Sequence, residues 1–138
     1  MSGIDETEAA HLVVAERAPA AIGPYSHAVV AGELVVCSGQ LGLHPASGEL
    51  VDGGTAAQTA QSLTNLAAVL EAAGSSMDQV LRTTVYLTDL GDFPAVNDVY
   101  AAAFGSHRPA RVTVEVQALP AGASVEIECI ARAAGASA

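Results

Sequence analysis

The chain has 138 residues, which suits one domain better than two independent cores. Apolar residues make up 51% and charged residues 14% of the sequence, so a hydrophobic core is available and wholesale disorder is excluded. The 5 basic residues are all arginine, and with 15 acidic residues the net charge is −10. This balance disfavours nucleic-acid partners and acidic membrane surfaces, and the absence of lysine excludes Schiff-base and P-loop chemistry.

The first part of the chain is predicted to contain three strands. Residues 1–8 are acidic and polar, unlike a signal peptide, and are expected to be a frayed tail. Residues 11–14 form a candidate first strand, and residues 18–25 carry two prolines and a glycine, which indicates a shaped loop. Residues 28–30 and 34–38 flank a short Ala-Gly-Glu segment, and this pattern predicts a hairpin.

A helix is predicted after a loop rich in glycine, proline and serine at 39–54. Thr55 and Gln58 have the spacing of a capping box, in which each side chain satisfies a free backbone N–H. Gly74 is placed to end the helix as a left-handed cap. The apolar stripe of this helix is Leu63, Leu66, Ala67 and Leu70.

A strand and a second helix follow. Residues 80–87 are β-branched and rich in threonine, which favours a strand. Asp92 is a candidate N-cap, Pro94 fits the first turn and Gly105 ends the helix. Its predicted buried stripe is Val96, Val99, Tyr100 and Ala103.

Two alternating strands at 111–116 and 124–132, joined by a turn at 119–122, complete the domain, and residues 133–138 are expected to be a second tail. The sequence therefore predicts a single α+β domain spanning residues 1–138, with two helices on one face of a six-stranded mixed sheet. Because two helices leave the other face uncovered and several strands are apolar on both faces, we expect the chain to form oligomers.

Metal binding and membrane insertion are not expected. The four histidines are scattered without paired ligand spacing, and no CxxC motif occurs. No apolar run approaches the length needed to span a bilayer, so we expect a cytoplasmic protein. Cys37 and Cys129 lie in apolar runs and are interpreted as small buried side chains in a reducing compartment, with a disulfide between them as the alternative.

Arg111 is the first candidate for chemistry. It follows Pro109-Ala110 at the start of a strand, on the strand's polar side. A planar guanidinium there can hold a carboxylate through two parallel hydrogen bonds. A cross-strand ion pair with a neighbouring glutamate explains the same pattern.

Two acids and two hydroxyls are further candidates. Glu126 and Glu128 share the polar side of the last strand, which is also what a solvated face would show. A tight turn before this strand would place Glu126 near Glu115 rather than near Arg111. Tyr25 and Ser38 each adjoin a glycine-rich turn, where a hydroxyl can project into a cleft or simply belong to a loop.

At these residues the sequence resembles the Rid family (YjgF-type reactive intermediate imine deaminases). The resemblance covers about residues 18–132, in the family's order. Its matching stretches are 18–26 (APAAIGPYS), 37–40 (CSGQ), 72–74 (AAG), 82–86 (RTTVY), 93–97 (FPAVN), 109–111 (PAR) and 125–128 (VEIE).

The resemblance implies a chorismate-mutase-like fold and a homotrimer with clefts between subunits. It implies hydrolysis of 2-imino acids, among them 2-iminobutanoate and 2-iminopropanoate, and of their enamine tautomers to 2-oxo acids and ammonia. It implies no cofactor. Alternatives are an endoribonuclease activity, against which the charge argues, and a trimer that senses small carboxylates without turnover.

The resemblance also implies roles for individual residues. Arg111 matches the arginine that grips the substrate carboxylate, and Glu126 matches the glutamate that orients the attacking water. The implied catalytic residues are Glu126, Arg111 and Tyr25, and the implied substrate-binding residues are Arg111, Ser38, Gly39, Asn97 and Thr113. Thr113 stands where many members have cysteine, so a role for that thiol is lost, and the segment 105–108 is shorter than in some members.

Overall fold

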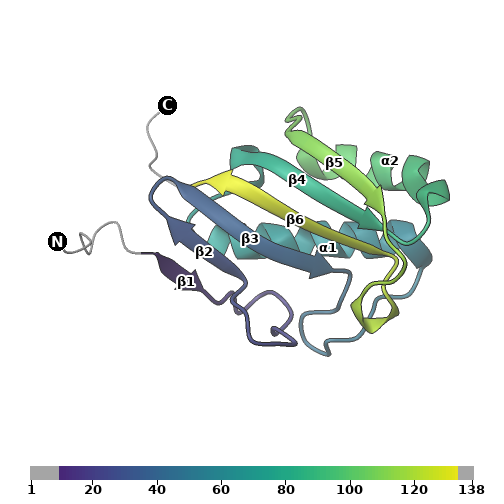
Figure 1. Cartoon of the computed structure of the whole chain (residues 1–138), viewed down its shortest axis with the longest axis horizontal. Helices are drawn as coiled ribbons and strands as arrows, with labels where there is room; N and C mark the ends of the chain where they lie inside the picture. Colours follow the sequence, from purple (N-terminus) through teal and green to yellow (C-terminus); the bar gives the residue numbers. More distant parts are fainter. Residues whose placement is uncertain (1–9, 134–138) are drawn as a thin grey trace, which may run out of the picture.

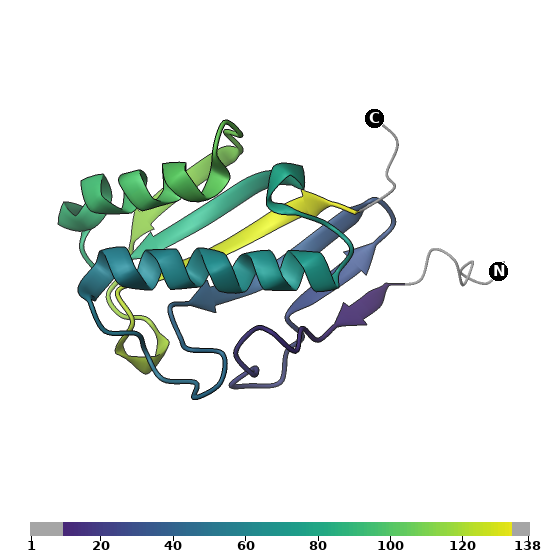
Figure 2. The ribbon, with the colours of Figure 1, turned by 180° about the vertical axis from the view of Figure 1, so that it is seen from behind.

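The computed structural model describes residues 10–133, in which six strands form one mixed sheet (Figure 1). The strands are β1 (His11–Val13), β2 (Ala28–Ala31), β3 (Leu34–Leu41), β4 (Val80–Leu87), β5 (Ala110–Glu115) and β6 (Val125–Arg132). Their order across the sheet is β1-β2-β3-β6-β4-β5. Helices α1 (Gly54–Ala72) and α2 (Phe93–Phe104) both cover the face that Figure 2 turns toward the viewer. The predicted α+β fold, with two helices on one face of the sheet, is therefore confirmed.

The core lies between the helices and the sheet. Along β6 the residues at odd positions are buried and those at even positions are half-buried, as the alternation predicted. The buried residues of β6 belong to one cluster with Leu63, Leu66 and Leu70 of α1, which confirms these three positions of the predicted stripe. Burial of an aliphatic side chain stabilises the fold by about 1.5–3 kcal/mol, so this stripe fixes the helix on the sheet.

The other face of the sheet has no helix, and apolar side chains remain exposed on it. In the register of the sheet, Leu12, Val29, Val36 and Ile130 occupy one row on that face. The large apolar side chains exposed on this face include Leu12, Leu34, Val36, Val112 and Val114, each at least 38% exposed. Exposed apolar side chains gathered on one face of a sheet are typical of an interface with another protein chain.

The end of α1 matches its prediction, whereas its start does not. Gly74 adopts a φ of 77° and donates its N–H to the carbonyl of Glu71, while the Ser75 N–H reaches the carbonyl of Leu70, as in a Schellman motif. At the start, the predicted capping box is wrong, because Gly53 is the N-cap and has no side chain to bond. The Thr55 hydroxyl donates instead to the Asp92 carboxylate, 2.9 Å away.

The contact between Thr55 and Asp92 also explains why the predicted N-cap of α2 makes no capping hydrogen bond. Asp92 occupies the N-cap position but makes no side-chain cap bond, because its carboxylate accepts from α1. Val96 and Tyr100 are buried as predicted, but Ala103 is exposed and Phe104 is buried instead. The stripe therefore continues from Tyr100 to the residue four positions on, one helical turn toward Gly105.

The strands β5 and β6 are not neighbours, although a turn joins them. β4 lies between them, parallel to β5 and antiparallel to β6. The parallel pair requires a crossover connection, which α2 provides. Tyr86 of β4 therefore separates Glu126 from β5, and Glu126 lies beside neither Glu115 nor Arg111 in the sheet.

The predicted end of the third strand and the predicted start of the C-terminal tail differ from the structure. β3 extends to Leu41, beyond the predicted end at Ser38, because a bulge lets its pairing with β6 continue. The N-terminal tail predicted at 1–8 and residues 134–138 lie outside the described residues. Ala133 is part of the fold, since its N–H donates to the carbonyl of Glu33. No helix within residues 10–133 has the length and apolar character of a membrane span.

Candidate functional site

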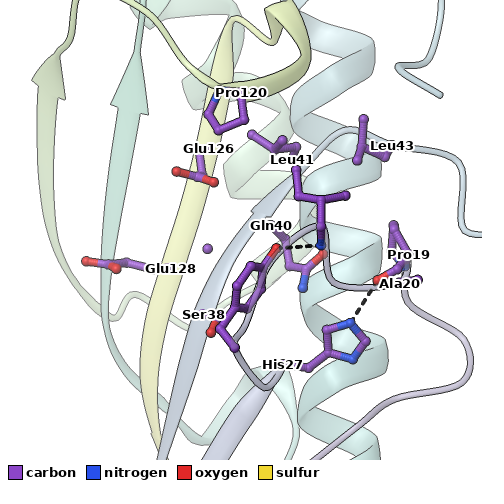
Figure 3. Close-up of a pocket in the computed structure, with 13 residues that line it drawn as sticks. Pro19, Ala20, His27, Ser38, Gln40, Leu41, Leu43, Pro120, Glu126 and Glu128 are labelled. Carbon is purple, nitrogen blue, oxygen red and sulfur yellow. Dashed lines mark hydrogen bonds between the residues drawn. The ribbon is translucent and has the colours of Figure 1, made fainter. Parts of the chain in front are cut away.

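A cavity of about 650 Å³ opens beside the ends of β3 and β6. Figure 3 shows Glu126 and Glu128 on β6 at one side, and Pro19 and His27 at the other. Its lining residues are Pro19, Ala20, Ile22, Tyr25, His27, Ser38, Gly39, Gln40, Leu41, Leu43, Pro120, Glu126 and Glu128. Four residues expected at one site from the sequence therefore come together here, namely Tyr25, Ser38, Gly39 and Glu126.

Glu126 is held against the backbone of β3. A Cβ atom built on Gly39 would lie 2.8 Å from the Cδ of Glu126, closer than real side chains approach. Only glycine therefore lets the Glu126 carboxyl group lie across β3 at this point. Burial raises the pKa of Glu126, and the nearby Glu128 carboxylate raises it further. A carboxyl group with a raised pKa is suited to taking a proton near neutral pH.

Two hydroxyls line the same cavity. The Ser38 hydroxyl donates to the carbonyl of Ser26 at 2.7 Å and so ties β3 to the segment that carries Tyr25. The Tyr25 hydroxyl accepts a hydrogen bond from the N–H of Ile22 at 3.3 Å, and Tyr25 is 46% exposed. The Tyr25 O–H is not the donor in that contact, so it can still donate a hydrogen bond into the solvent-accessible space that Tyr25 faces.

Glu128 is a cavity residue that the sequence placed only on a polar face. Its Oε1 accepts the hydroxyl of Tyr86 at 2.9 Å, and this hydrogen bond is the largest cause of the raised pKa of Tyr86. The i, i+2 spacing of Glu126 and Glu128 signals that both share one face, but no local pattern shows that a cavity opens there. His27, from the facing segment, gave no signal in the sequence.

Arg111 belongs to β5 and forms a second cluster with side chains of α2. Its guanidinium donates to Oδ1 of Asn97 at 2.8 Å. The guanidinium carbon also lies 4.9 Å from the centre of the Tyr100 ring and 5.2 Å from that of Phe93, within cation–π distance. Within residues 10–133 Arg111 makes no ion pair with a glutamate, so the cross-strand ion pair considered from the sequence is wrong.

Thr113 follows Arg111 at i+2 and shares its side of β5. In the sheet register Arg111 pairs with Thr83 and Thr113 with Val85, and both β4 residues are fully buried toward the helices. This side of β5 carries the polar residues, as predicted, and it faces α2. The Thr113 hydroxyl is buried and has no hydrogen-bond partner within residues 10–133.

The two clusters occupy opposite faces of the sheet. Arg111, Asn97 and Thr113 lie on the helix-covered face, at the edge strand β5. Glu126 lies on β6 at a position whose neighbours Val125 and Ile127 face the helices, so its own side chain faces away from them. The expected site residues thus form two clusters on opposite faces of the sheet, which we call the Arg111 half-site and the Glu126 half-site.

The two cysteines lie opposite each other on β3 and β6. Both are buried free thiols, as the apolar runs around them predicted. The hydrogen bond with Cys37 and burial raise the pKa of the Cys129 thiol, which keeps it protonated and unreactive.

Comparisons with known proteins point to one family. A family model described as Endoribonuclease L-PSP matches residues 15–133. A goat (Capra hircus) protein named 2-iminobutanoate/2-iminopropanoate deaminase is 51% identical over 87% of this chain and 88% of its own length. The human protein of the same name is 47% identical over 83% of this chain and 84% of its own length. The crystal structure of RidA from an Antarctic Psychrobacter superposes with a TM-score of 0.85 at 45% identity, covering 88% of this chain and 98% of that one.

Proposed function

Because this chain belongs to the Rid family, whose family model is described as Endoribonuclease L-PSP, we propose that it hydrolyses small 2-imino acids to 2-oxo acids and ammonia. The proposed substrates are 2-iminobutanoate, 2-iminopropanoate and their enamine tautomers, as in the names of the similar goat and human proteins. The observation that carries the proposal is the pair of half-sites, one presenting a guanidinium and the other a half-buried carboxyl group with a raised pKa.

The two half-sites divide the chemistry between them. The Arg111 guanidinium holds the substrate carboxylate bidentately, and Thr113 lies two residues further on the same side of β5. Asn97 and the aromatic rings of α2 fix the guanidinium plane. Because the imine carbon is already electrophilic, most of the catalytic effect comes from placing substrate and water together.

Glu126 supplies the base in the proposed reaction. It accepts a proton from water as the water oxygen bonds to the imine carbon, and that proton then passes to the nitrogen. In the resulting carbinolamine the hydroxyl proton also moves to the nitrogen as the C–N bond breaks, so ammonia leaves and the carbon becomes the carbonyl of the 2-oxo acid. Tyr25 assists at the nitrogen with its hydroxyl, while Ser38 and Gly39 shape the wall on which Glu126 lies.

We propose that the working unit is a homotrimer, with each cleft built from the Arg111 half-site of one copy and the Glu126 half-site of its neighbour. Two observations support this arrangement: the half-sites lie on opposite faces of one sheet, and the face without helices is apolar. Closed symmetry would bury that face in every copy. The buried free thiols suit a reducing compartment, and we place the reaction in the cytoplasm.

The test generates the imine in place. Purified protein is mixed with a threonine dehydratase and threonine, and semicarbazide traps the imine that the dehydratase releases. We expect the protein to reduce the trapped imine in proportion to its concentration, and Arg111→Ala to abolish this effect without changing the oligomer. Trapping that is undiminished by the wild-type protein would contradict the proposed function.

The description of the family model makes endoribonuclease activity the second candidate. The net charge of −10 and the absence of lysine argue against it, because affinity for nucleic acid comes largely from neutralised phosphates. RNA cleavage by nuclease-free protein, lost in the Glu126→Gln variant, would support this candidate over the deaminase.

A further inference from the structure

His27 lines the same cavity as Tyr25, and its imidazole is almost fully buried in the cavity wall. It is 3% exposed and follows the segment of residues 15–26, which we call the Tyr25 loop. Its Nδ1 lies 2.8 Å from the backbone nitrogen of Ala15, and its Nε2 lies 2.8 Å from the carbonyl oxygen of Pro19. One side chain thus bonds the loop at its first residue and again four residues later.

These two partners fix the tautomer of the ring. A backbone N–H can only donate, so Nδ1 carries the lone pair that accepts from Ala15. The carbonyl of Pro19 can only accept, so Nε2 carries the proton. A neutral imidazole protonated at Nε2 satisfies both groups, and a doubly protonated ring could not accept from Ala15.

His27 cannot itself act on a substrate in this arrangement, because both ring nitrogens are already bonded to the backbone. Its main chain is equally committed: its N–H donates to Val13 and its carbonyl accepts from Ser38. The residue therefore joins β1, β3 and the Tyr25 loop through four hydrogen bonds. The loop also meets α1 through Arg17 and Glu71, but these side chains are 77% and 73% exposed, and exposed ion pairs of this kind contribute little.

We propose that His27 is a positioning residue of the deaminase site: its neutral imidazole fastens the Tyr25 loop at Ala15 and Pro19 and thereby sets where the Tyr25 hydroxyl lies in the cavity. The inference rests on the proposed function and adds to it a residue that acts through another. Without the imidazole, two buried backbone groups would lose their partners and the loop would be free to shift.

The test compares two replacements of His27. In His27→Gln the amide oxygen can accept from Ala15 and the amide nitrogen can donate to Pro19, so this variant should keep kcat within about three-fold of wild type. His27→Leu has similar bulk and neither hydrogen bond, and we expect its kcat to fall about ten-fold with KM changed less than about three-fold. The matched control is Arg17→Ala, which removes the exposed contact of the same loop and should leave both constants unchanged.

A double-mutant cycle separates positioning from loss of folded protein. If His27 acts by placing Tyr25, then Tyr25→Phe should lower kcat in wild type but change it less than about two-fold in the His27→Leu background. Additive losses, or His27→Leu activity equal to wild type, would overturn the inference while leaving the proposed function intact. Absence of deaminase activity in the wild-type protein would instead overturn both.

A spectroscopic measurement applies even if His27→Leu fails to fold. In the full-length, ¹⁵N-labelled wild-type protein, the His27 ring should show the nitrogen shifts of a neutral ring protonated at Nε2 and bare at Nδ1 at neutral pH. A ring protonated at Nδ1, or charged, would be incompatible with the bond from Ala15 and would overturn the inference.

Discussion

Arg111 and Glu126 of one chain point to opposite faces of the same sheet, with β4 between their strands. Arg111 pairs in register with the buried Thr83 and lies on the rings of α2, whereas Glu126 lies among the half-buried residues of β6. Alternation along a strand makes this arrangement rigid, because neither side chain can cross the sheet without a change of register. We therefore propose that a reaction that needs both groups draws them from two copies of the chain.

The first prediction concerns how Arg111 holds its ligand. Arg111→Lys keeps the positive charge but loses the planar, two-pronged donor and its stacking on Tyr100. We expect kcat/KM for the imine to fall about 10- to 100-fold, the effect of one charge-assisted hydrogen bond. Steady-state kinetics with Arg17→Lys as the control measures this, and a variant that matches wild type would show that Arg111 does not bind the carboxylate.

A second prediction follows from the raised pKa of Glu126. Because the Glu126 carboxyl group binds its proton more tightly than an ordinary glutamate, the base is lost at a higher pH on acidification. Glu128→Gln removes one cause of the raised pKa and keeps an acceptor for Tyr86. The acidic limb of the kcat/KM profile should therefore move to lower pH.

The control for this pH shift is Glu33→Gln, which removes the same charge from the exposed hairpin turn. It should leave the acidic limb in place. A Glu128→Gln profile that superposes on wild type, or moves to higher pH, would mean that Glu126 is not the titrating base.

Gly39→Ala tests the close contact under Glu126. The added Cβ would lie 2.8 Å from Cδ of Glu126, so the carboxyl group must move. We expect kcat to fall at least about ten-fold, since catalysis of this kind depends on placement. Gly48→Ala is the matched control, because Gly48 has a φ of 73° and open space around it. That variant should lower the free energy of unfolding by about 1 kcal/mol and leave kcat unchanged.

The apolar face of the sheet provides a prediction about assembly. Val36 is 47% exposed at the centre of the row formed by Leu12, Val29 and Ile130. Val36→Asp should dissociate the proposed trimer and remove the proposed activity, because a carboxylate would be buried without a partner in the expected interface. Light scattering measures the mass, and Leu90→Asp, at a similar exposure beside α2, serves as the control. A fully active Val36→Asp monomer would contradict the shared site.

Local patterns predicted most elements but not how they neighbour one another. The strand at 80–87 was predicted from its β-branched and threonine residues and the strand at 124–132 from its alternation, and the structure contains both. The insertion of β6 between β3 and β4 depends on pairing between distant segments, for which single positions carry no signal. The same is true of Thr55, whose hydroxyl meets Asp92 from another helix rather than its own backbone.

The candidate site, too, could be predicted only in part. Tyr25, Ser38, Gly39 and Glu126 were expected together from the family resemblance, and the fold does place them around one cavity. The face of Arg111 could not be predicted, because it depends on which strand lies beside β5. His27 was missed since its role lies in two backbone contacts that exist only after the loop has folded.

Subunit mixing tests the shared site most directly. Arg111→Ala and Glu126→Gln variants are each purified as inactive protein, unfolded together and refolded at equal concentration, with mixed oligomers verified by mass. If each cleft combines Arg111 of one copy with Glu126 of its neighbour, random mixing rebuilds about a quarter of the clefts and about a quarter of wild-type activity should return. Mixed oligomers as inactive as either parent would show that one chain supplies both residues and would contradict the account.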